Sequence, residues 1–186
     1  MKSIVTSLVT AVFLAAAQTV LCAQGQASPL SAFAAVTLPK DLGPETADLV
    51  VRGRTEKGVP LNLDMKTIMA LPSVTFRAFD PWDGVEYDFT GVSLKDFMAW
   101  VGIKDEAKSL VLTARNSYTI PIKRSDYEKN AYYIVYMIGG KLFADDPAAK
   151  QRGPLAIAID FAASKGLPIE IYRHQLVWKL ADIVVQ

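Results

Sequence analysis

The chain has 186 residues, of which 51% are hydrophobic and 10% aromatic, and its formal net charge is +1. This composition excludes an intrinsically disordered protein, because a chain with many apolar residues and little net charge buries a core. The balance of 20 basic and 19 acidic residues also argues against a protein that binds nucleic acid through its phosphates. A chain of this length is expected to form one domain.

Residues 1–27 have the pattern of a secretory signal peptide. A lysine follows the first methionine, the stretch 4–17 is almost wholly apolar or small, and small residues at positions 25 and 27 suit cleavage before Ser28. Two alternatives remain open at this point. One is cleavage after Ala23, and the other is an uncleaved anchor helix, for which the apolar run is short.

Cleavage before Ser28 would also remove Cys22, the one cysteine of the sequence. The mature chain would then have no disulfide, no thiol nucleophile and no thiolate ligand for a metal. An oxidising compartment without disulfides favours a bacterial periplasm over a eukaryotic extracellular space. We therefore expect a periplasmic protein that is not inserted in the membrane after export.

The rest of the chain predicts a short lead-in followed by a single strand-rich domain. Residues 28–47 are small and polar with three prolines and are expected to be extended, whereas residues 48–186 form the domain. Runs of apolar and β-branched residues predict ten strands, at 48–54, 59–63, 74–79, 85–90, 109–115, 118–123, 131–138, 141–143, 155–159 and 177–185. Many short strands without a repeating strand–helix–strand pattern indicate an α+β fold.

Two helices are clear in the sequence. Asp64 is expected to cap a short helix that carries Met65, Ile68 and Met69 inward and ends before Pro72. Ser93 begins the second helix, and its apolar residues follow helical spacing until Gly102 ends it. These inward residues are Leu94, Phe97, Met98 and Val101.

Several kinds of catalytic site have no support in the sequence. His174 is the single histidine, so a zinc site of nitrogen and sulfur ligands cannot be assembled, and we expect a surface or structural role for it. No G-x-S-x-G, G-x-G-x-x-G or P-loop motif occurs, which argues against a serine hydrolase and against nucleotide binding. Hydrolysis by paired carboxylates stays open, although no spacing recommends a particular pair.

Residues suited to recognition of a heterocycle lie in the predicted loops. Trp82 either packs on the core or stacks on a planar ligand. Asn116 lies at a strand junction, where it either favours the turn or offers an amide to a ligand. Asp83 and Asp126 either accept from an amino-pyrimidine edge or act as loop and cap residues.

Two cations and a further tryptophan complete the set of candidates. Lys150 and Arg152 precede Gly153 and either meet a ligand carbonyl or phosphate or remain solvated. Trp178 lies among apolar residues of the last predicted strand, so we expect it mainly in the core.

Six short motifs follow one another along the chain: Leu49-Val-Val-Arg-Gly53, Phe89-Thr-Gly-Val-Ser-Leu94, Asn116-Ser-Tyr118, Gly140-Lys141, Gly153-Pro-Leu155, and Val177-Trp-Lys-Leu180 with Ile183. Their order and spacing resemble the molybdopterin-binding domain of the sulfite-oxidase type, over residues 48–186. The resemblance implies an α+β fold of mixed and antiparallel strands around a deep pterin pocket.

One loop departs from the enzymatic members of that family. They bind molybdenum through a cysteine in the loop after the strand that ends here near Phe79, where this chain has Asp80-Pro81-Trp82. A Pro-Trp loop instead resembles small secreted pterin-binding proteins of the PruR type. That resemblance implies a reduced pterin bound without metal and reported to a membrane-bound cyclic-di-GMP enzyme.

The resemblance also implies roles for individual residues. Trp82 would stack on the pterin, Asn116 and Tyr118 would line its pocket, and a cation before Gly-Pro-Leu would close it. Such proteins often place an arginine where this chain has Lys150, so whether Lys150 or Arg152 faces the pocket remains open.

Three functional hypotheses follow from these observations. The leading one is a secreted, non-catalytic protein that binds a reduced pterin, such as a tetrahydropterin, without molybdenum and partners the periplasmic domain of a membrane signalling protein. The second is a subunit of a periplasmic molybdopterin-dependent oxidoreductase. The third is an interaction module with a vestigial pocket, which predicts that Trp82 is buried and that no cleft lies beside Asn116 and Tyr118.

Overall fold

A computed structural model describes residues 32–33, 35–36, 38, 42–164 and 166–186. The predicted signal peptide, Cys22 and part of the expected lead-in segment fall outside these residues. No helix in the described part of the chain is long and apolar enough to cross a membrane.

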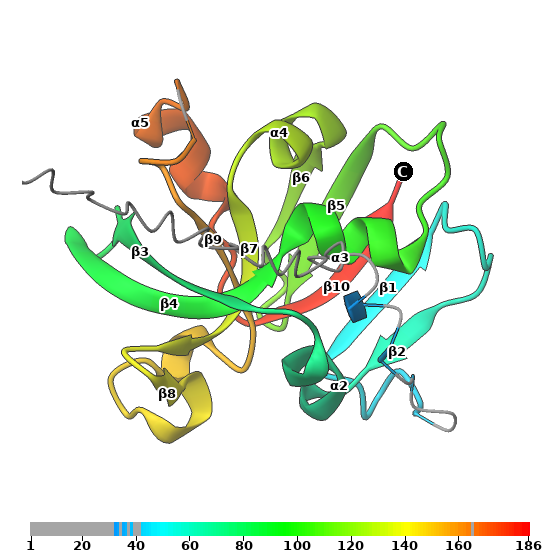
Figure 1. Ribbon diagram of the computed structural model, residues 1–186, viewed down its shortest axis with the longest axis horizontal. Coiled ribbons are helices and arrows are strands. Elements are labelled where there is room, and N and C mark those ends of the chain that lie inside the picture. The colour runs from blue at the N-terminus through cyan, green and yellow to red at the C-terminus, as the bar shows by residue number, and fades with distance from the viewer. Residues whose placement is uncertain (1–31, 34, 37, 39–41, 165) are drawn as a thin grey trace, which may run out of the picture.

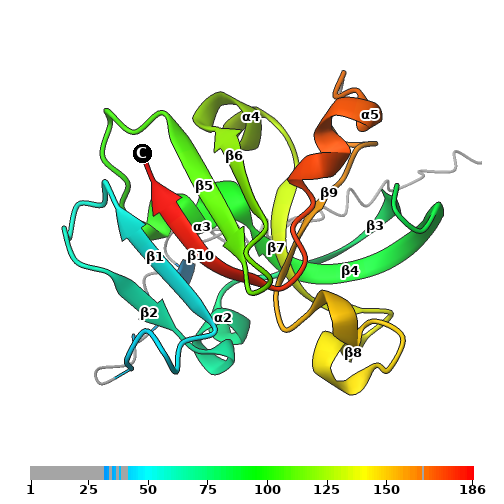
Figure 2. The ribbon, with the colours of Figure 1, turned by 180° about the vertical axis from the view of Figure 1, so that it is seen from behind.

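Two five-stranded sheets form the framework of the domain (Figures 1 and 2). The first sheet has the order β2 (Leu61–Leu63), β1 (Leu49–Gly53), β10 (Leu180–Val185), β5 (Ser109–Ala114) and β6 (Thr119–Lys123). Strands β1 and β10 pair in parallel, and the other pairs are antiparallel. The second sheet is antiparallel, with β3 (Val74–Asp80), β4 (Val85–Ser93), β7 (Tyr132–Ile138) and β8 (Lys141–Leu142), while β9 (Ala156–Ile159) also pairs with β7.

Short helices complete the structure between the strands. The α-helices are α2 (Met65–Ala70), α3 (Leu94–Val101), α4 (Arg124–Lys129) and α5 (Ile169–Tyr172), and the 3-10 helices are η1 (Phe143–Asp145), η2 (Lys150–Arg152) and η3 (Arg173–Gln175). Figures 1 and 2 show α3 lying against one face of the first sheet. All ten predicted strands are present in the structure, with boundaries that differ from the prediction by a few residues.

Helix α3 confirms the sequence prediction. The side chain of Ser93 accepts a hydrogen bond from the backbone N–H of Asp96, and Gly102 ends the helix with a φ of 75°. All four predicted inward residues are buried. The apolar spacing was sufficient to predict this helix because the helix packs one continuous face on the core.

Helix α2 begins as expected, but its inward face differs from the prediction. The Asp64 side chain accepts from the backbone N–H of Thr67, and Ile68 is buried. Met69, which was expected to point inward, is 42% exposed. Successive helical residues are rotated by about 100°. Because Thr67 and Ile68 face the core, Met69 is turned toward solvent.

The core has two parts. The larger part combines side chains of α3 with strands of both sheets and includes Phe33, which packs against Trp100 with a ring-centre distance of 6.4 Å. The lead-in segment therefore contributes a side chain to the core as well as leading into the domain. The smaller part lies against the second sheet and includes Phe89, Val135 and Phe143.

A glycine allows β4 and β7 to approach closely. The pairing of these strands shifts register between Thr90 and Gly91. A Cβ atom on Gly91 would lie 2.3 Å from the carbonyl oxygen of Ile134 and 2.7 Å from the Cα atom of Val135. Because neither backbone atom belongs to a flexible side chain, this position requires glycine.

Candidate binding pocket

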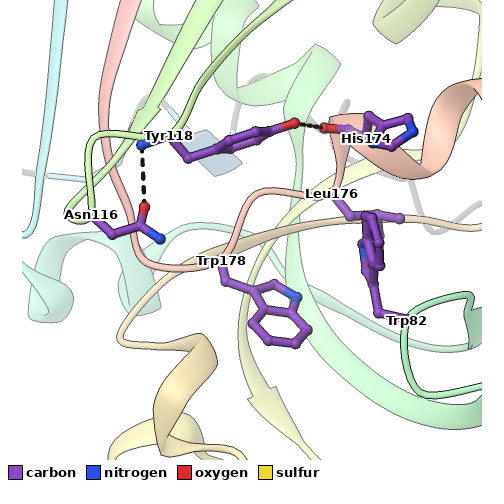
Figure 3. A pocket seen from close by; sticks show the side chains of 6 residues that line it. All are labelled: Trp82, Asn116, Tyr118, His174, Leu176 and Trp178. Atoms are coloured by element: carbon purple, nitrogen blue, oxygen red, sulfur yellow. Dashed lines mark hydrogen bonds between the residues drawn. The ribbon is translucent and has the colours of Figure 1, made fainter.

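A pocket of about 300 Å³ opens beside the ends of both sheets. Figure 3 shows its six lining side chains arranged around a common space: Trp82, Asn116, Tyr118, His174, Leu176 and Trp178. Trp82 comes from the β3–β4 hairpin, whereas Asn116 and Tyr118 come from the β5–β6 turn. The remaining three residues come from η3 and the segment that leads into β10.

The β5–β6 turn holds Asn116 and Tyr118 at the pocket. Ser117 has a φ of 68°, and its N–H donates to the carbonyl oxygen of Ala114 over 2.9 Å. The Asn116 side-chain oxygen accepts from the backbone N–H of Tyr118 over 3.2 Å. Asn116 therefore does both things weighed from the sequence: its oxygen stabilises the turn, and its amide lies on the pocket wall.

Tyr118 and His174 connect the turn to η3. The Tyr118 hydroxyl donates to the backbone carbonyl of His174 over 2.6 Å, as drawn in Figure 3. The His174 ring meets Trp82 edge to face, with ring centres 5.7 Å apart. Contacts among the lining residues therefore link the two sheets across the pocket.

A tight hairpin turn presents Trp82, which is 46% exposed. The Asp80 oxygen Oδ1 accepts from the backbone N–H of Trp82 over 2.8 Å and from that of Asp83 over 3.3 Å. The guanidinium of Arg173 lies 5.2 Å from the centre of the Trp82 ring. The tryptophan is therefore held by its backbone and by a cation, while nearly half of its surface remains open.

Arg152 lies behind the pocket and is only 3% exposed. Its guanidinium pairs with the carboxylates of Asp80 and Asp83. The same group lies 4.5 Å from the ring centre of Trp178 and 5.1 Å from that of Tyr87. Arg152 lines a separate, more polar cavity of about 330 Å³ and not the aromatic pocket.

Tyr87 supports this ion pair. Its hydroxyl donates to Asp83 Oδ2 over 2.8 Å. That hydrogen bond, aided by burial, raises the pKa of the Tyr87 hydroxyl above its ordinary value. Tyr87 therefore remains a neutral donor to Asp83 at physiological pH.

The structure brings together some of the residues predicted from the sequence and separates others. Trp82, Asn116 and Tyr118 line one pocket. Asp83 and Arg152 lie directly behind it, paired with each other. Two other predicted residues do not line the pocket: Lys150 is exposed on η2, and Asp126 lies on α4.

Three lining residues were not assigned to the site from the sequence. Trp178 was expected mainly in the core, but it is half-buried and faces the pocket with one part and Arg152 with another. His174, expected at the surface or in a structural role, is exposed and also lines the pocket. Leu176 is buried and carries no sequence signal beyond its hydrophobicity.

The lining of the pocket offers flat apolar surfaces and a few polar groups. Its side chains are aromatic, aliphatic, amide and imidazole, and the described residues include no cysteine. Asp80 begins the Asp80-Pro81-Trp82 segment, in which the family's enzymes carry a metal ligand, and it uses its two oxygens for the turn and for Arg152. The size of the pocket, its apolar walls and its few polar groups are typical of sites that bind small molecules.

Comparison with known proteins confirms the expected fold class, a sulfite-oxidase-like α+β fold. A solved structure with this likeness is the sulfane dehydrogenase SoxCD from Paracoccus pantotrophus, with a TM-score of 0.58 and 15% sequence identity. The match covers 78% of this chain and 39% of the SoxCD chain, so the present chain corresponds to well under half of that protein. No protein-family model and no curated protein sequence matches the chain.

Proposed function

We propose that the pocket binds the bicyclic ring of a reduced pterin, such as a tetrahydropterin, and that the protein acts as a binding protein without catalysis. The observation that carries this proposal is the cavity lined by Trp82, Tyr118 and Trp178 beside the amide of Asn116. Indole and phenol rings stack on planar heterocycles, and an amide complements the donors and acceptors on a pterin edge.

The exposure of Trp82 distinguishes this proposal from a vestigial pocket. A vestigial site would have Trp82 packed in the core and no cleft beside Asn116 and Tyr118. Trp82 is instead 46% exposed and borders an open cavity with both residues. Exposure of an indole ring to water is unfavourable, which supports a ligand that covers the ring.

The proposal also includes a location and a partner. The signal-peptide pattern supports export to the periplasm, and the resemblance to PruR-type proteins supports the periplasmic domain of a membrane cyclic-di-GMP enzyme as the partner. Phe79 and Val85, which are 38% and 46% exposed, flank the turn that carries Trp82. A ligand that covers Trp82 would therefore alter a surface with exposed apolar side chains, which a partner protein can recognise.

Ligand binding is tested by anaerobic calorimetric titration of the protein, produced from the full sequence, with a tetrahydropterin. A parallel titration with the oxidised pterin tests whether the pocket prefers the reduced form. We expect saturable binding with one site per chain, accompanied by a change in tryptophan fluorescence. Absence of saturable binding by either ligand would refute the proposed function.

A second candidate is a subunit of a molybdenum-dependent oxidoreductase, which is favoured by the fold likeness to the sulfane dehydrogenase SoxCD. Elemental analysis of protein purified from its native host separates the two functions. The binding proposal predicts far less than one molybdenum per chain, together with a small heterocycle released on denaturation and detected by mass spectrometry. Stoichiometric molybdenum would favour the oxidoreductase instead.

A further inference from the structure

Arg152 contacts both tryptophan-bearing segments of the pocket. Its side chain is buried and reaches the β3–β4 hairpin through two carboxylates and the β10 lead-in through an indole ring. It does not itself line the aromatic pocket.

The first connection runs to Trp82. Arg152 pairs with Asp80 and Asp83, one on each side of the Pro81-Trp82 dipeptide. The second oxygen of Asp80 accepts from the backbone N–H of Trp82 over 2.8 Å. The guanidinium therefore holds both ends of the short turn that presents this indole.

The second connection runs to Trp178. The Arg152 guanidinium lies 4.5 Å from the centre of the Trp178 ring, within the range of a cation–π contact. The backbone carbonyl of Arg152 also accepts from the N–H of Lys179 over 2.7 Å. The ring and the backbone next to it are thus both tied to the same arginine.

We infer that Arg152 is a positioning residue that fixes the two indoles of the pocket relative to each other, without contact to the ligand. This inference rests on the proposed binding function for its consequence, but the placement of the indoles can be tested without ligand. Removing the guanidinium would leave the Asp80 carboxylate, which is 2% exposed, without its cation. A buried carboxylate without a partner is costly, so we expect the hairpin turn to rearrange and let water reach Asp80.

The consequence for binding follows from preorganisation. If the fraction of molecules with both indoles in place falls to about one tenth, the apparent dissociation constant rises about tenfold. A lysine at this position would keep the charge but lose the planar fork that reaches two carboxylates and stacks on an indole.

The test compares Arg152→Met with Lys150→Met, a matched control two residues away on the same 3-10 helix whose side chain is exposed. Both proteins are labelled with 5-fluorotryptophan and studied by fluorine NMR without ligand. The chain has three tryptophans, and Trp100 packs on Phe97 in the main core as an internal reporter. Single Trp→Phe variants assign the three signals.

We expect the Trp82 and Trp178 signals to shift or broaden in Arg152→Met while the Trp100 signal stays unchanged, and all three to stay unchanged in Lys150→Met. Pterin affinity should fall about tenfold in Arg152→Met alone. Unchanged Trp82 and Trp178 signals would refute the inference, as would an equal change at Trp100, which would indicate a global structural effect.

Asp83→Asn serves as a second variant if Arg152→Met does not fold. This variant keeps the ion pair between Arg152 and Asp80. Because the Asp83 side chain is 35% exposed, the fold should tolerate the change. We expect the Trp82 signal to move and the Trp178 signal to remain. A wild-type protein that binds no pterin would refute the proposed function while the NMR comparison still decides the role of Arg152.

Discussion

Trp82→Ala is the most direct perturbation of the candidate site. The indole is 46% exposed, so a ligand that stacks on it removes about 100 Å² of apolar surface from water. At about 25 cal/mol per Å², this burial contributes about 2.5 kcal/mol. The dissociation constant for a tetrahydropterin should therefore rise roughly 50- to 100-fold in the variant.

Isothermal titration calorimetry under anaerobic conditions measures the change, with Val85→Ala as the control. Val85 lies on the same hairpin and is exposed to the same extent, 46%, but does not line the pocket. The control should bind with wild-type affinity. An unchanged dissociation constant in Trp82→Ala, or an equal loss in Val85→Ala, would refute the stacking role.

Three further substitutions test the physical account of the fold. Gly91→Ala should destabilise the protein by about 1–3 kcal/mol, because its Cβ would lie 2.3 Å from a backbone oxygen, and an unchanged urea midpoint would contradict this. Burial raises the pKa of Tyr127 to about 12, so the folded state retains the proton and loses about 3 kcal/mol of stability as the pH rises from about 10 to 12. Because its hydroxyl is buried without a hydrogen-bond partner in the described residues, Tyr127→Phe should be at least as stable at pH 7 and resist alkaline unfolding better, as circular dichroism against pH would show. Asp64→Ala should cost about 1 kcal/mol through the lost helix cap; hydrogen bonds from Thr67 lower the pKa of Asp64 below 3.8, so this difference should shrink as the pH falls below that value in acid-unfolding curves.

The sequence predicted local structure well where one periodicity dominates. Helix α3 packs four apolar side chains at helical spacing on the core, and the Gly139-Gly140 pair turns β7 into β8 with positive φ at both residues. Helix α4 was missed because Tyr127 is its one buried residue, so it has no apolar stripe to detect. A six-residue helix that buries a single side chain is fixed by its neighbours and not by its own pattern.

The candidate site was predicted in part for a similar reason. Trp82, Asn116 and Tyr118 lie in loops, where an aromatic or amide side chain stands out against the polar background. Trp178 was missed as a pocket residue because an indole among apolar neighbours has the same pattern whether it faces the core or a cavity. The ion pair of Arg152 with Asp80 joins residues 72 positions apart, and no local pattern reports a contact of that separation.

The contacts of Asp80 support the proposal that the pocket binds an organic ligand without a metal. It begins the Asp80-Pro81-Trp82 segment, where the sulfite-oxidase-type resemblance implies a metal-binding cysteine, and its Oδ1 accepts from the backbone of Trp82 while Oδ2 pairs with Arg152. A metal ion there would have to displace a buried guanidinium, and leaving one member of a buried ion pair unpaired costs about 3–5 kcal/mol. The arginine and the aspartate thus tie the hairpin to the pocket wall and keep Trp82 in place. These contacts are the structural basis for proposing an organic ligand in place of molybdenum.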